Sequence, residues 1–287
     1  MSELLHDKPA LRAVCDAWRA QGQRIGFVPT MGALHAGHMS LVDAARKHGA
    51  TRVVLSIFVN PTQFGPQEDF AKYPRTLTQD LALCDAAGLD VVYAPSVDTL
   101  YPAGFASHVE VDQITRLWEG TARPTHFRGV TTVVAKLLNM VGPCIAAFGR
   151  KDYQQWRVIE RMARDLDMPV EILGCPILRD QDGLAMSSRN RYLSSSERQR
   201  AVAIVTGLRA ANAAYRAGER RAAELSGLVR AGVQKAFDSI DYVALADAHS
   251  LVPCPERVDT AAVVLVAARL GRTRLIDNAL LGEDALT

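Results

Sequence analysis

Residues 24–59 read RIGFVPTMGALHAGHMSLVDAARKHGATRVVLSIFV, and this stretch decides the fold. Arg24–Val28 and the β-branched run Arg52–Val59 predict two buried strands, and Met39–His48 has the apolar spacing of an amphipathic helix. A strand, a helix and a second strand of continuous apolar character form a β-α-β unit, in which the two strands lie parallel. The stretch therefore predicts a parallel sheet with a helix packed on one face.

The same alternation continues through the first 175 residues. Further helices are predicted at Ala10–Ala20, Leu77–Ala87, Val130–Met140 and Tyr153–Leu166, and further strands at Val91–Tyr93, Ile145–Phe148 and Val170–Leu173. Repeated alternation with apolar strands is typical of a sheet covered by helices on both faces. The predicted fold class is α/β, with a Rossmann-like doubly wound parallel sheet.

The pattern changes after residue 175. Ser194 and Glu197 form a capping-box pattern that opens a long Ala-rich helix towards Arg216. A second helix is predicted at Ala222–Phe237, followed by strands at Tyr242–Leu245, Ala262–Ala268 and Arg274–Ile276. We therefore expect a larger domain over residues 1–175 and a smaller α+β domain over residues 176–287.

The composition is that of a globular chain with balanced charge. Its 287 residues, 48% of them hydrophobic, are enough for one large or two modest domains. Lys and Arg number 33 and Asp and Glu 31, which gives a net charge of +2. A protein that binds nucleic acid or an anionic membrane by charge alone has a basic excess, so we expect neither partner.

The cysteines and the N-terminus indicate the compartment. The five cysteines are odd in number and form no C-x-x-C motif, so a disulfide framework or structural zinc site is not expected. The first residues, MSELLHDKPA, lack the apolar core of a signal peptide, and no run of about 18 apolar residues occurs. We expect a protein of the reducing cytoplasm.

The first stretch that carries chemistry is residues 28–38, VPTMGALHAGH, between a predicted strand and helix. Open α/β sheets bind ligands at this carboxyl edge of the strands. Gly32 and Gly37 let the backbone approach a ligand, and His35 and His38 lie near a helix N-terminus, which favours phosphate. The alternatives are an ordinary loop with two surface histidines and, less favoured because no third ligand lies nearby, a metal site.

The second stretch is residues 183–190, GLAMSSRN, at the predicted domain junction. The hydroxyls of Ser187 and Ser188 can hydrogen-bond to a polyphosphate, and Arg189 can bind it with two parallel hydrogen bonds. The alternative is a solvated turn between domains. Because the stretch follows the sheet, we expect it to meet the two histidines at a single triphosphate.

Together these stretches resemble a known pair of motifs. The H-x-G-H element looks like the HIGH motif of class I aminoacyl-tRNA synthetases and related nucleotidyltransferases, and the M-S-S-R element is similar to their KMSKS loop. More narrowly, five segments occur here in the order found in the pantoate–β-alanine ligase family: PTMGALHAGH, NPTQFGPQEDFAKYPRT, HFRGVTTVVAKLLN, FGRKDYQQ and DGLAMSSRNRYL. The chain is thus identified as a member of that family, by resemblance over nearly its whole length.

The resemblance implies a reaction and its partners. Members of the family join pantoate to β-alanine through a pantoyl adenylate, and release AMP and pyrophosphate from ATP with magnesium required. It implies a nucleotidyltransferase-type sheet that binds nucleotide and substrates, a C-terminal lid domain and a homodimer. The expected small-molecule partners are ATP, pantoate and β-alanine.

The resemblance also assigns site residues. His38 matches the residue assigned as proton donor and His35 its partner; an imidazolium there would stabilise the charge that grows as pyrophosphate departs. Gln63 and Gln155 match glutamines that bind pantoate and, for Gln63, β-alanine as well. The expected ATP contacts are Met31, Gly32, Ala33, Leu34, His35, Ala36, Gly37, His38, Gly149, Arg150, Lys151, Asp152, Leu178, Met186, Ser187, Ser188 and Arg189.

A protein-held magnesium site has little support in the sequence. Some relatives have adjacent carboxylates where this chain reads Thr78-Gln79-Asp80, so Asp80 is the one candidate ligand in that motif. Magnesium commonly binds substrate phosphates and few protein ligands, and we expect it to arrive mainly with ATP.

Two other functions stay open from the sequence. One is a different nucleotidyltransferase that transfers AMP to a phosphorylated acceptor; Gln63, Gln155 and the full motif series favour the ligase over it. The other is a nucleotide-sensing or tRNA-binding protein without catalysis. The intact His35 and His38 and the absence of a basic surplus favour an enzyme.

Overall fold

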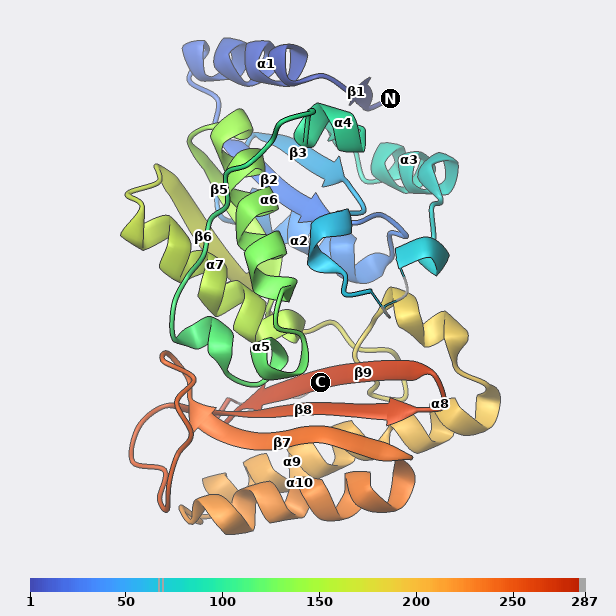
Figure 1. The fold of residues 1–287 in the computed structure, drawn as a ribbon, viewed down its shortest axis with the longest axis vertical. Coiled ribbons are helices and arrows are strands. Elements are labelled where there is room, and N and C mark those ends of the chain that lie inside the picture. Colours follow the sequence, from blue (N-terminus) through green and yellow to red (C-terminus); the bar gives the residue numbers. More distant parts are fainter. Residues whose placement is uncertain (67, 69, 284–287) are drawn as a thin grey trace. The chain divides into compact units, whose positions relative to one another are not determined.

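The computed structural model describes residues 1–66, 68 and 70–283, and they form two sheets (Figure 1). The first has six strands in the order β1-β4-β3-β2-β5-β6, and all neighbours pair in parallel. Its strands are β1 (Glu3–Leu5), β2 (Ile25–Thr30), β3 (Arg52–Ile57), β4 (Val91–Tyr93), β5 (Cys144–Gly149) and β6 (Val170–Cys175). The α/β class and the parallel sheet predicted from the sequence are confirmed.

Helices cover both faces of this sheet, as the alternation of its buried side chains requires. Phe27, Val54 and Ala146 point into one apolar cluster, while Val28 and Leu55 point into another on the opposite face. The first face is covered by α1 (Lys8–Ala20), α6 (His126–Val141) and α7 (Tyr153–Asp165), and the second by α2 (Ala36–Lys47) and α3 (Leu77–Ala86). The sheet is therefore doubly wound.

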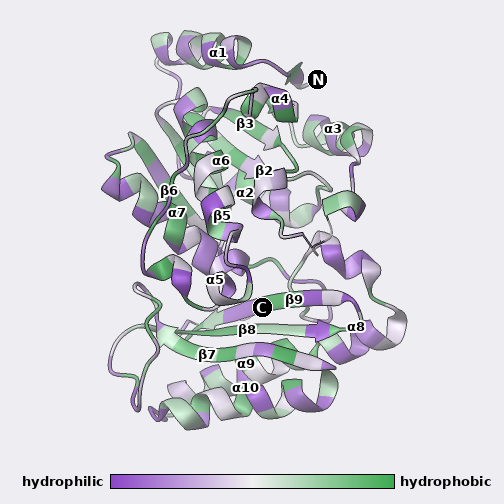
Figure 2. Cartoon of the chain, viewed as in Figure 1, coloured by the Kyte–Doolittle hydropathy of each residue, from purple (hydrophilic) through white to green (hydrophobic). Residues whose placement is uncertain are grey.

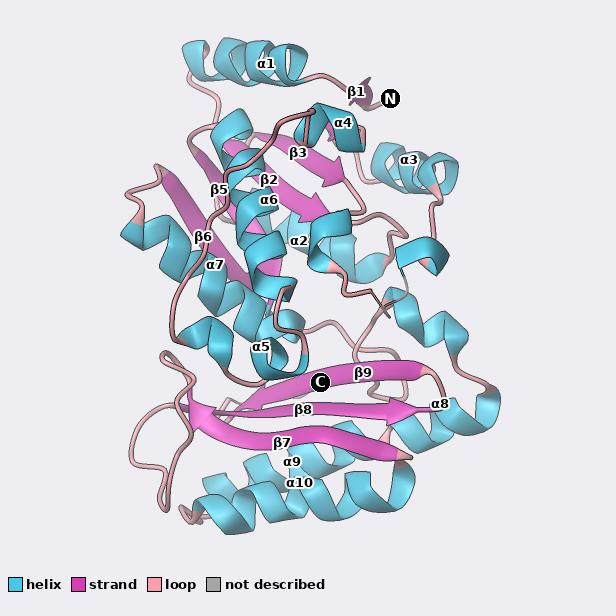
Figure 3. Ribbon diagram, in the orientation of Figure 1, coloured by secondary structure: helices cyan, strands magenta, loops and turns pink. Residues whose placement is uncertain are grey.

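The second sheet is antiparallel, with the order β7-β8-β9 (Figure 3). Its strands are β7 (Ser239–Asp247), β8 (Ala262–Leu270) and β9 (Thr273–Leu280). One face packs on α9 (Ala203–Arg216) and α10 (Ala222–Ala236), where Leu208, Leu225 and Val229 are fully buried. Figure 2 shows strands of both sheets mainly in green, because their apolar side chains form the two cores. The predicted smaller α+β fold is confirmed.

The chain crosses between two compact units several times. Unit 1 comprises Met1–Thr115, Arg123–Arg150 and Gln155–Pro176, and unit 2 comprises Arg116–Ala122, Lys151–Gln154 and Ile177–Thr287. The sequence pattern predicted one division at residue 175 and did not indicate the two short segments that join unit 2. The roles of binding domain and lid stay predictions.

Two details differ from the predicted elements. The helix expected from Ser194 to Arg216 is divided at Val202 into α8 (Ser195–Ala201) and α9, and the Thr206 hydroxyl donates to the Val202 carbonyl. A hydroxyl that bonds back to its own helix favours a bend. The edge strand β1 was not predicted, since three residues carry no periodicity.

Short elements complete the chain, and several lie beside the predicted site. They are η1 (Pro61–Gln63), η2 (Phe70–Lys72), α4 (Val97–Leu100), η3 (Ile114–Arg116), α5 (Glu119–Ala122), η4 (Arg150–Asp152) and η5 (Ser188–Tyr192). Across the residues that the structure describes, no helix has the length and apolar character needed to span a membrane.

Candidate active site

The strand order of unit 1 places the candidate site. The chain runs from β2 to β3 on one side of the sheet and from β5 to β6 on the other, while β2 and β5 pair directly. A crevice opens outside the carboxyl ends of the strands where the order reverses in this way, and ligands bind there. The loops after Thr30 and Gly149 leave this edge, and both belong to the predicted ATP contacts.

The loop after β2 is held by a buried carboxylate. Gly32 and Ala33 both have left-handed backbones, with φ of 80° and 51°. The N–H groups of Ala33 and Leu34 donate to the two oxygens of Asp80 on α3, at 3.0 and 2.8 Å. Asp80 is 1% exposed and also accepts from the Thr76 hydroxyl. These charge-assisted bonds fix a backbone shape that alanine rarely adopts.

The two histidines cap helix α2 reciprocally. His35 is the N-cap residue, and its Nδ1 accepts from the Gly37 N–H at 3.1 Å, while Nδ1 of His38 accepts from the His35 N–H at 3.2 Å. Their ring centroids lie 4.1 Å apart. In this arrangement Nδ1 of each ring is engaged with the loop backbone, and Nε2 is the remaining ring nitrogen. The role of an imidazolium at the phosphates, expected from the sequence, stays a prediction.

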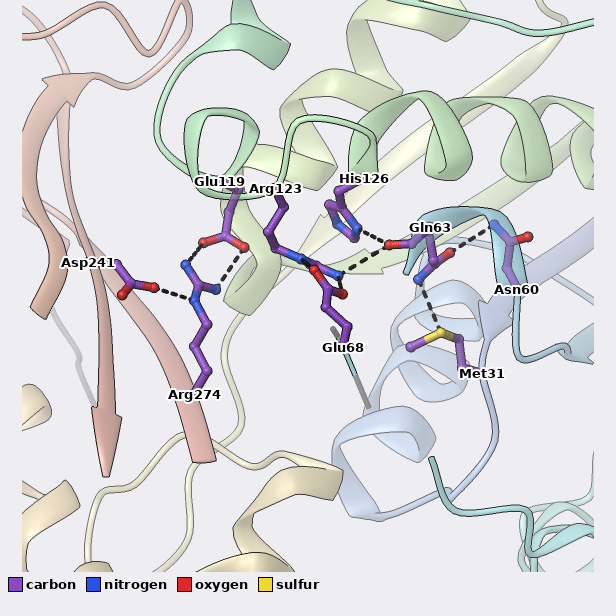
Figure 4. A network of polar contacts seen from close by, with 9 residues as sticks. All are labelled: Met31, Asn60, Gln63, Glu68, Glu119, Arg123, His126, Asp241 and Arg274. Atoms are coloured by element: carbon purple, nitrogen blue, oxygen red, sulfur yellow. Dashed lines mark hydrogen bonds and ion pairs between the residues drawn. The ribbon is translucent and has the colours of Figure 1, made fainter. Parts of the chain in front are cut away.

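Gln63 lies buried in a network that fixes its amide (Figure 4). The Asn60 Nδ2 donates to Gln63 Oε1 at 3.1 Å, and Gln63 Nε2 donates to the Met31 sulfur at 3.1 Å. Asn60 also donates to the Gly129 carbonyl on α6 at 3.1 Å. Met31 and Gln63, predicted from separate motifs to contact ATP and pantoate, are thus brought side by side.

The backbone of Gln63 is held from α6 as well. Its carbonyl accepts from His126 Nδ1 at 3.0 Å and from the Arg123 guanidinium at 3.3 Å. Arg123 in turn donates to both oxygens of Glu68, at 2.7 and 2.6 Å (Figure 4). Burial raises the pKa of Glu68, but the hydrogen bonds and charge of Arg123, together with His126 and the Gly65 backbone, outweigh it, so the net pKa lies below its usual value. A charged pair therefore supports the Gln63 carbonyl.

The GRKD motif is divided between the two units. Gly149 and Arg150 belong to unit 1, whereas Lys151 and Asp152 belong to unit 2. The Lys151 ammonium lies 3.7 Å from the Asp152 carboxylate. Gln155 begins the unit 1 part of α7 and is half-buried.

In unit 2, a hairpin brings two further predicted ATP contacts together. The Met186 N–H donates to the Leu178 carbonyl at 3.0 Å, and the hairpin turns at Gly183, whose φ is 88°. Leu178 is 39% exposed, so part of its side chain is open to contact with a ligand. Ser187 follows directly and caps η5 by accepting from the Arg189 N–H at 3.3 Å.

The predicted site residues thus form two groups. Unit 1 gathers the loop Met31–His38 and the amide of Gln63, with Gly149, Arg150 and Gln155 at the carboxyl side of the same sheet. Unit 2 holds Lys151, Asp152, Leu178 and Met186–Arg189. That the two groups converge on one triphosphate stays a prediction.

The contacts of Asp80 give it a structural role, and its role as a magnesium ligand stays a prediction. Both of its oxygens accept from backbone N–H groups of the histidine loop. Within residues 1–66, 68 and 70–283, no group of three or more His, Cys, Asp or Glu side chains is arranged to hold a metal ion.

Cysteine chemistry is not supported either. All five cysteines are free, and Cys15, Cys84, Cys144 and Cys175 are buried. Burial raises the pKa of Cys84 and Cys144 to about 12, so their thiols stay protonated and poorly nucleophilic.

Three residues at the site were not selected from the sequence: Asn60, His126 and Arg123. Each stands in a quoted motif, NPTQFG or HFRG and its flank, but nothing in the spacing connects them to Gln63. Asn60 directly follows a buried strand and precedes a proline, which is a capping signal. A capping signal of this kind marks Asn60 as a turn residue, but it is too general to predict that Asn60 binds Gln63.

Comparison with known proteins supports the same grouping. A family model of the pantoate-beta-alanine ligases matches residues 3–280. The chain is 49% identical to a pantothenate synthetase of Syntrophotalea carbinolica over 98% of this chain and 99% of that protein. It is 52% identical to a pantothenate synthetase of Sphingopyxis alaskensis over 96% and 98%.

Solved structures agree in fold. A crystal structure of pantothenate synthetase from Thermus thermophilus matches with a TM-score of 0.90 and 43% identity, over 97% of this chain and 99% of that one. A pantoate–β-alanine ligase from Francisella tularensis, crystallised with a β,γ ATP compound and β-alanine, matches with a TM-score of 0.78 and 32% identity over 98% of each chain. The family model, the relatives and the solved structures all match nearly the whole length of the chain. The chain therefore belongs to the pantoate–β-alanine ligase family.

Proposed function

We propose that this protein condenses pantoate with β-alanine to form pantothenate, with ATP cleaved to AMP and pyrophosphate. One observation carries the proposal. The loop that holds His35 and His38 contacts the fixed amide of Gln63 through Met31, at the edge of the sheet where the strand order reverses. Membership in the family supports the same substrates, as does the relative crystallised with β-alanine and an ATP compound.

In the first step a pantoate carboxylate oxygen attacks the α-phosphorus of ATP, the bond to the bridging oxygen breaks, and pyrophosphate leaves. We assign the Nε2–H groups of His35 and His38 to the phosphate oxygens, where charge grows as that bond breaks. The positive end of α2 acts in the same direction. We assign Lys151, Ser187, Ser188 and Arg189 to the triphosphate.

In the second step the amine of β-alanine attacks the acyl carbon of the adenylate, loses a proton, and expels AMP. The adenylate is needed because a free carboxylate has no adequate leaving group. Gln63 suits both acids, since its amide donates to a carboxylate and accepts from a hydroxyl or amine without a charge of its own. We assign Gln155 to pantoate, and Leu178 and Met186 to the nucleotide.

We further propose that magnesium is bound by the ATP phosphates. Hard oxygen ligands of the substrate satisfy its coordination with few protein ligands. The engagement of Asp80 with the histidine loop supports this assignment.

The proposal includes a homodimer and a cytoplasmic setting. The homodimer follows from the resemblance to the family, and light scattering of the purified chain tests it. The five free cysteines favour a compartment that keeps thiols reduced.

One experiment tests the function. The purified chain is incubated with ATP, magnesium, pantoate and β-alanine, and pantothenate, AMP and pyrophosphate are quantified. We expect equal amounts of the three products, and AMP formation that depends on pantoate. AMP transferred to a phosphorylated acceptor would instead favour another nucleotidyltransferase, and ATP binding without turnover would favour a nucleotide-sensing protein.

A further inference from the structure

Strand β9 of unit 2 carries three polar side chains, two of them buried, that bind segments distant in sequence. Arg274 and Asn278 lie on one face of the strand, because alternate residues share a face. Leu275 and Ala279 lie on the other, in the apolar core with α9 and α10, and Asp277 shares that face. Asp277 and Asn278 are 5% and 4% exposed. Buried polar groups of this kind need specific partners, and each has one.

Asn278 binds the segment that carries Lys151. Its Nδ2 donates to the Lys151 carbonyl at 2.9 Å. Two more bonds hold the same segment: the Tyr153 hydroxyl donates to the Ala248 carbonyl at 3.0 Å, and the Gln154 amide donates to the Leu117 carbonyl at 2.8 Å. These contacts explain why Lys151–Gln154 belongs to unit 2 although the residues on either side belong to unit 1.

Arg274, on the same face, binds the other segment that joins unit 2. Its guanidinium donates to both oxygens of Glu119 on α5, at 2.9 and 2.5 Å, and to Asp241 on β7 at 2.6 Å (Figure 4). The Gln154 amide oxygen in turn accepts from the Glu119 N–H at 3.0 Å. The two segments are therefore bound to β9 and to each other.

Asp277 binds the hairpin Leu178–Met186 from the opposite face of the strand. Its carboxylate accepts two hydrogen bonds from Arg179, at 2.6 and 3.1 Å, and both side chains are nearly inaccessible. Arg179 also donates to the carbonyl of Gly183 at the hairpin turn, at 3.2 Å. Strand β9 packs against η5 as well, which contains Ser188 and Arg189.

We propose that Asp277 and Asn278 are positioning residues of the reaction. Through neighbouring positions of one strand, Asn278 sets the backbone of Lys151, and Asp277 sets the hairpin that presents Leu178 and Met186. The nucleotide contacts of unit 2 are thereby fixed relative to one another by a single rigid element. This inference rests on the proposed function, which assigns those residues to ATP.

The first test removes the bond from Asn278 and follows ATP. Affinity for ATP is measured by calorimetry without pantoate, and KM for ATP and kcat are measured in the full reaction. For Asn278→Ala we expect the Kd and KM for ATP to rise about ten-fold, as for the loss of one well-placed hydrogen bond, while kcat changes less than about three-fold. Should this variant not fold, Asn278→Ser takes its place with the same expectation.

Asn212 provides a matched control. It is a buried asparagine of unit 2 that donates to the Glu283 carbonyl at 2.9 Å and accepts from the Gly282 N–H. Asn212→Ala removes these two bonds, neither of which is linked to the nucleotide contacts. We expect it to lower Tm as Asn278→Ala does and to leave the KM for ATP within about two-fold.

A double-mutant cycle separates positioning from general stability. If Asn278 acts through Lys151, then Asn278→Ala in a Lys151→Ala background should weaken ATP binding by less than about two-fold. Equal losses in both backgrounds, or unchanged ATP affinity in Asn278→Ala, would overturn the role of Asn278.

The second arm tests Asp277. Arg179→Lys keeps the charge beside Asp277 but removes the paired hydrogen bonds. We expect a rise in the Kd for ATP that adds to the effect of Lys151→Ala, because the hairpin supplies separate contacts. A variant that melts lower yet binds ATP normally would overturn the role of Asp277. If the unsubstituted chain makes no AMP from ATP and pantoate, the proposed function fails. The ATP affinities measured by calorimetry still test whether Asp277 and Asn278 position the nucleotide contacts.

Discussion

His35 and His38 each use one ring nitrogen to bind the backbone of the loop they stand on. This use fixes the orientation of both rings. The pair forms a structural cap of α2, and its binding of phosphate stays a prediction.

At the residue scale, His38→Ala should depress formation of the adenylate by roughly 10²–10³-fold, the usual effect of removing one preorganised donor. The cap bond from His38 to the His35 N–H is lost as well, so thermal melting is measured in parallel. Single-turnover release of pyrophosphate reports the step. An unaltered rate would show that the role is misassigned.

Gln63→Ala should affect the two acids more than the nucleotide. We expect the KM for pantoate and for β-alanine to rise about ten-fold or more, because a paired amide is lost from each. Affinity for ATP, measured by calorimetry, serves as the internal control and should change little. A selective loss of ATP affinity would contradict the assignment of Gln63.

At the scale of elements, the loop between β2 and α2 depends on a residue of α3. The Asp80 oxygens hold the N–H groups of Ala33 and Leu34, and Ala33 and the preceding Gly32 have left-handed backbones. A carboxylate suits this place because both of its oxygens accept. An amide presents an NH₂ group to one of the two N–H donors.

Asp80→Asn should therefore loosen the histidine loop. We expect a loss of about 1–3 kcal/mol in the free energy of unfolding, the range for a buried donor left unsatisfied, and a higher KM for ATP. Chemical denaturation and steady-state kinetics check the two effects. Unchanged stability would mean that the asparagine satisfies both N–H groups, against the stated geometry.

The packing of α6 on η1 depends on Gly129. A Cβ at this position would lie 2.4 Å from the Thr62 carbonyl oxygen and 2.6 Å from the Gln63 nitrogen. Gly129→Ala should displace η1, and with it Gln63, so that the KM for pantoate rises along with a loss of stability. The cost expected of such overpacking is about 1–3 kcal/mol.

Gly227→Ala is the matched control, because Gly227 also lies inside a helix, α10, and a Cβ there meets no atom within 4 Å. We expect Gly227→Ala to stabilise the protein by up to about 1 kcal/mol through helix propensity, with kinetics unchanged. A normal KM for pantoate in Gly129→Ala would show that the packing of α6 on η1 does not position Gln63.

At the scale of the whole molecule, stability in acid has an identifiable contributor. Glu219 precedes α10 and accepts from the Arg221 guanidinium at 2.7 Å and from the N–H groups of Arg220 and Arg221. The side-chain bonds with Arg221, followed by its backbone N–H, lower the pKa of Glu219 from 4.5 to about 2.

A carboxylate whose pKa is lowered on folding stabilises the protein above its unfolded pKa, and this contribution is lost as pH falls through the folded pKa. The contribution of Glu219 should therefore be complete above pH 4.5 and disappear towards pH 2. We expect Glu219→Gln to melt below the unsubstituted chain at pH 6, with the difference narrowing as pH falls to 2. Calorimetric scans across this pH range measure the difference in melting temperature. A difference that does not change with pH would show that ionisation of Glu219 does not contribute to stability.

The sequence predicted the β-α alternation well, because apolar periodicity reports local burial directly. It placed most strands and helices within a few residues, but it joined α8 and α9 and omitted β1. The contacts of Gln63 with Asn60, His126 and Met31 were out of its reach, since they join residues as many as 63 positions apart. Spacing along a chain carries no information about such pairs.

The amino-acid sequence by itself determined the doubly wound sheet, the loop that follows its second strand and the family, because these depend on local patterns and on motifs in order. Only the tertiary structure decided what Asp80, Asp277 and Asn278 do. Their partners come from other elements, and a buried polar side chain takes its role from the donor or acceptor that the fold brings to it.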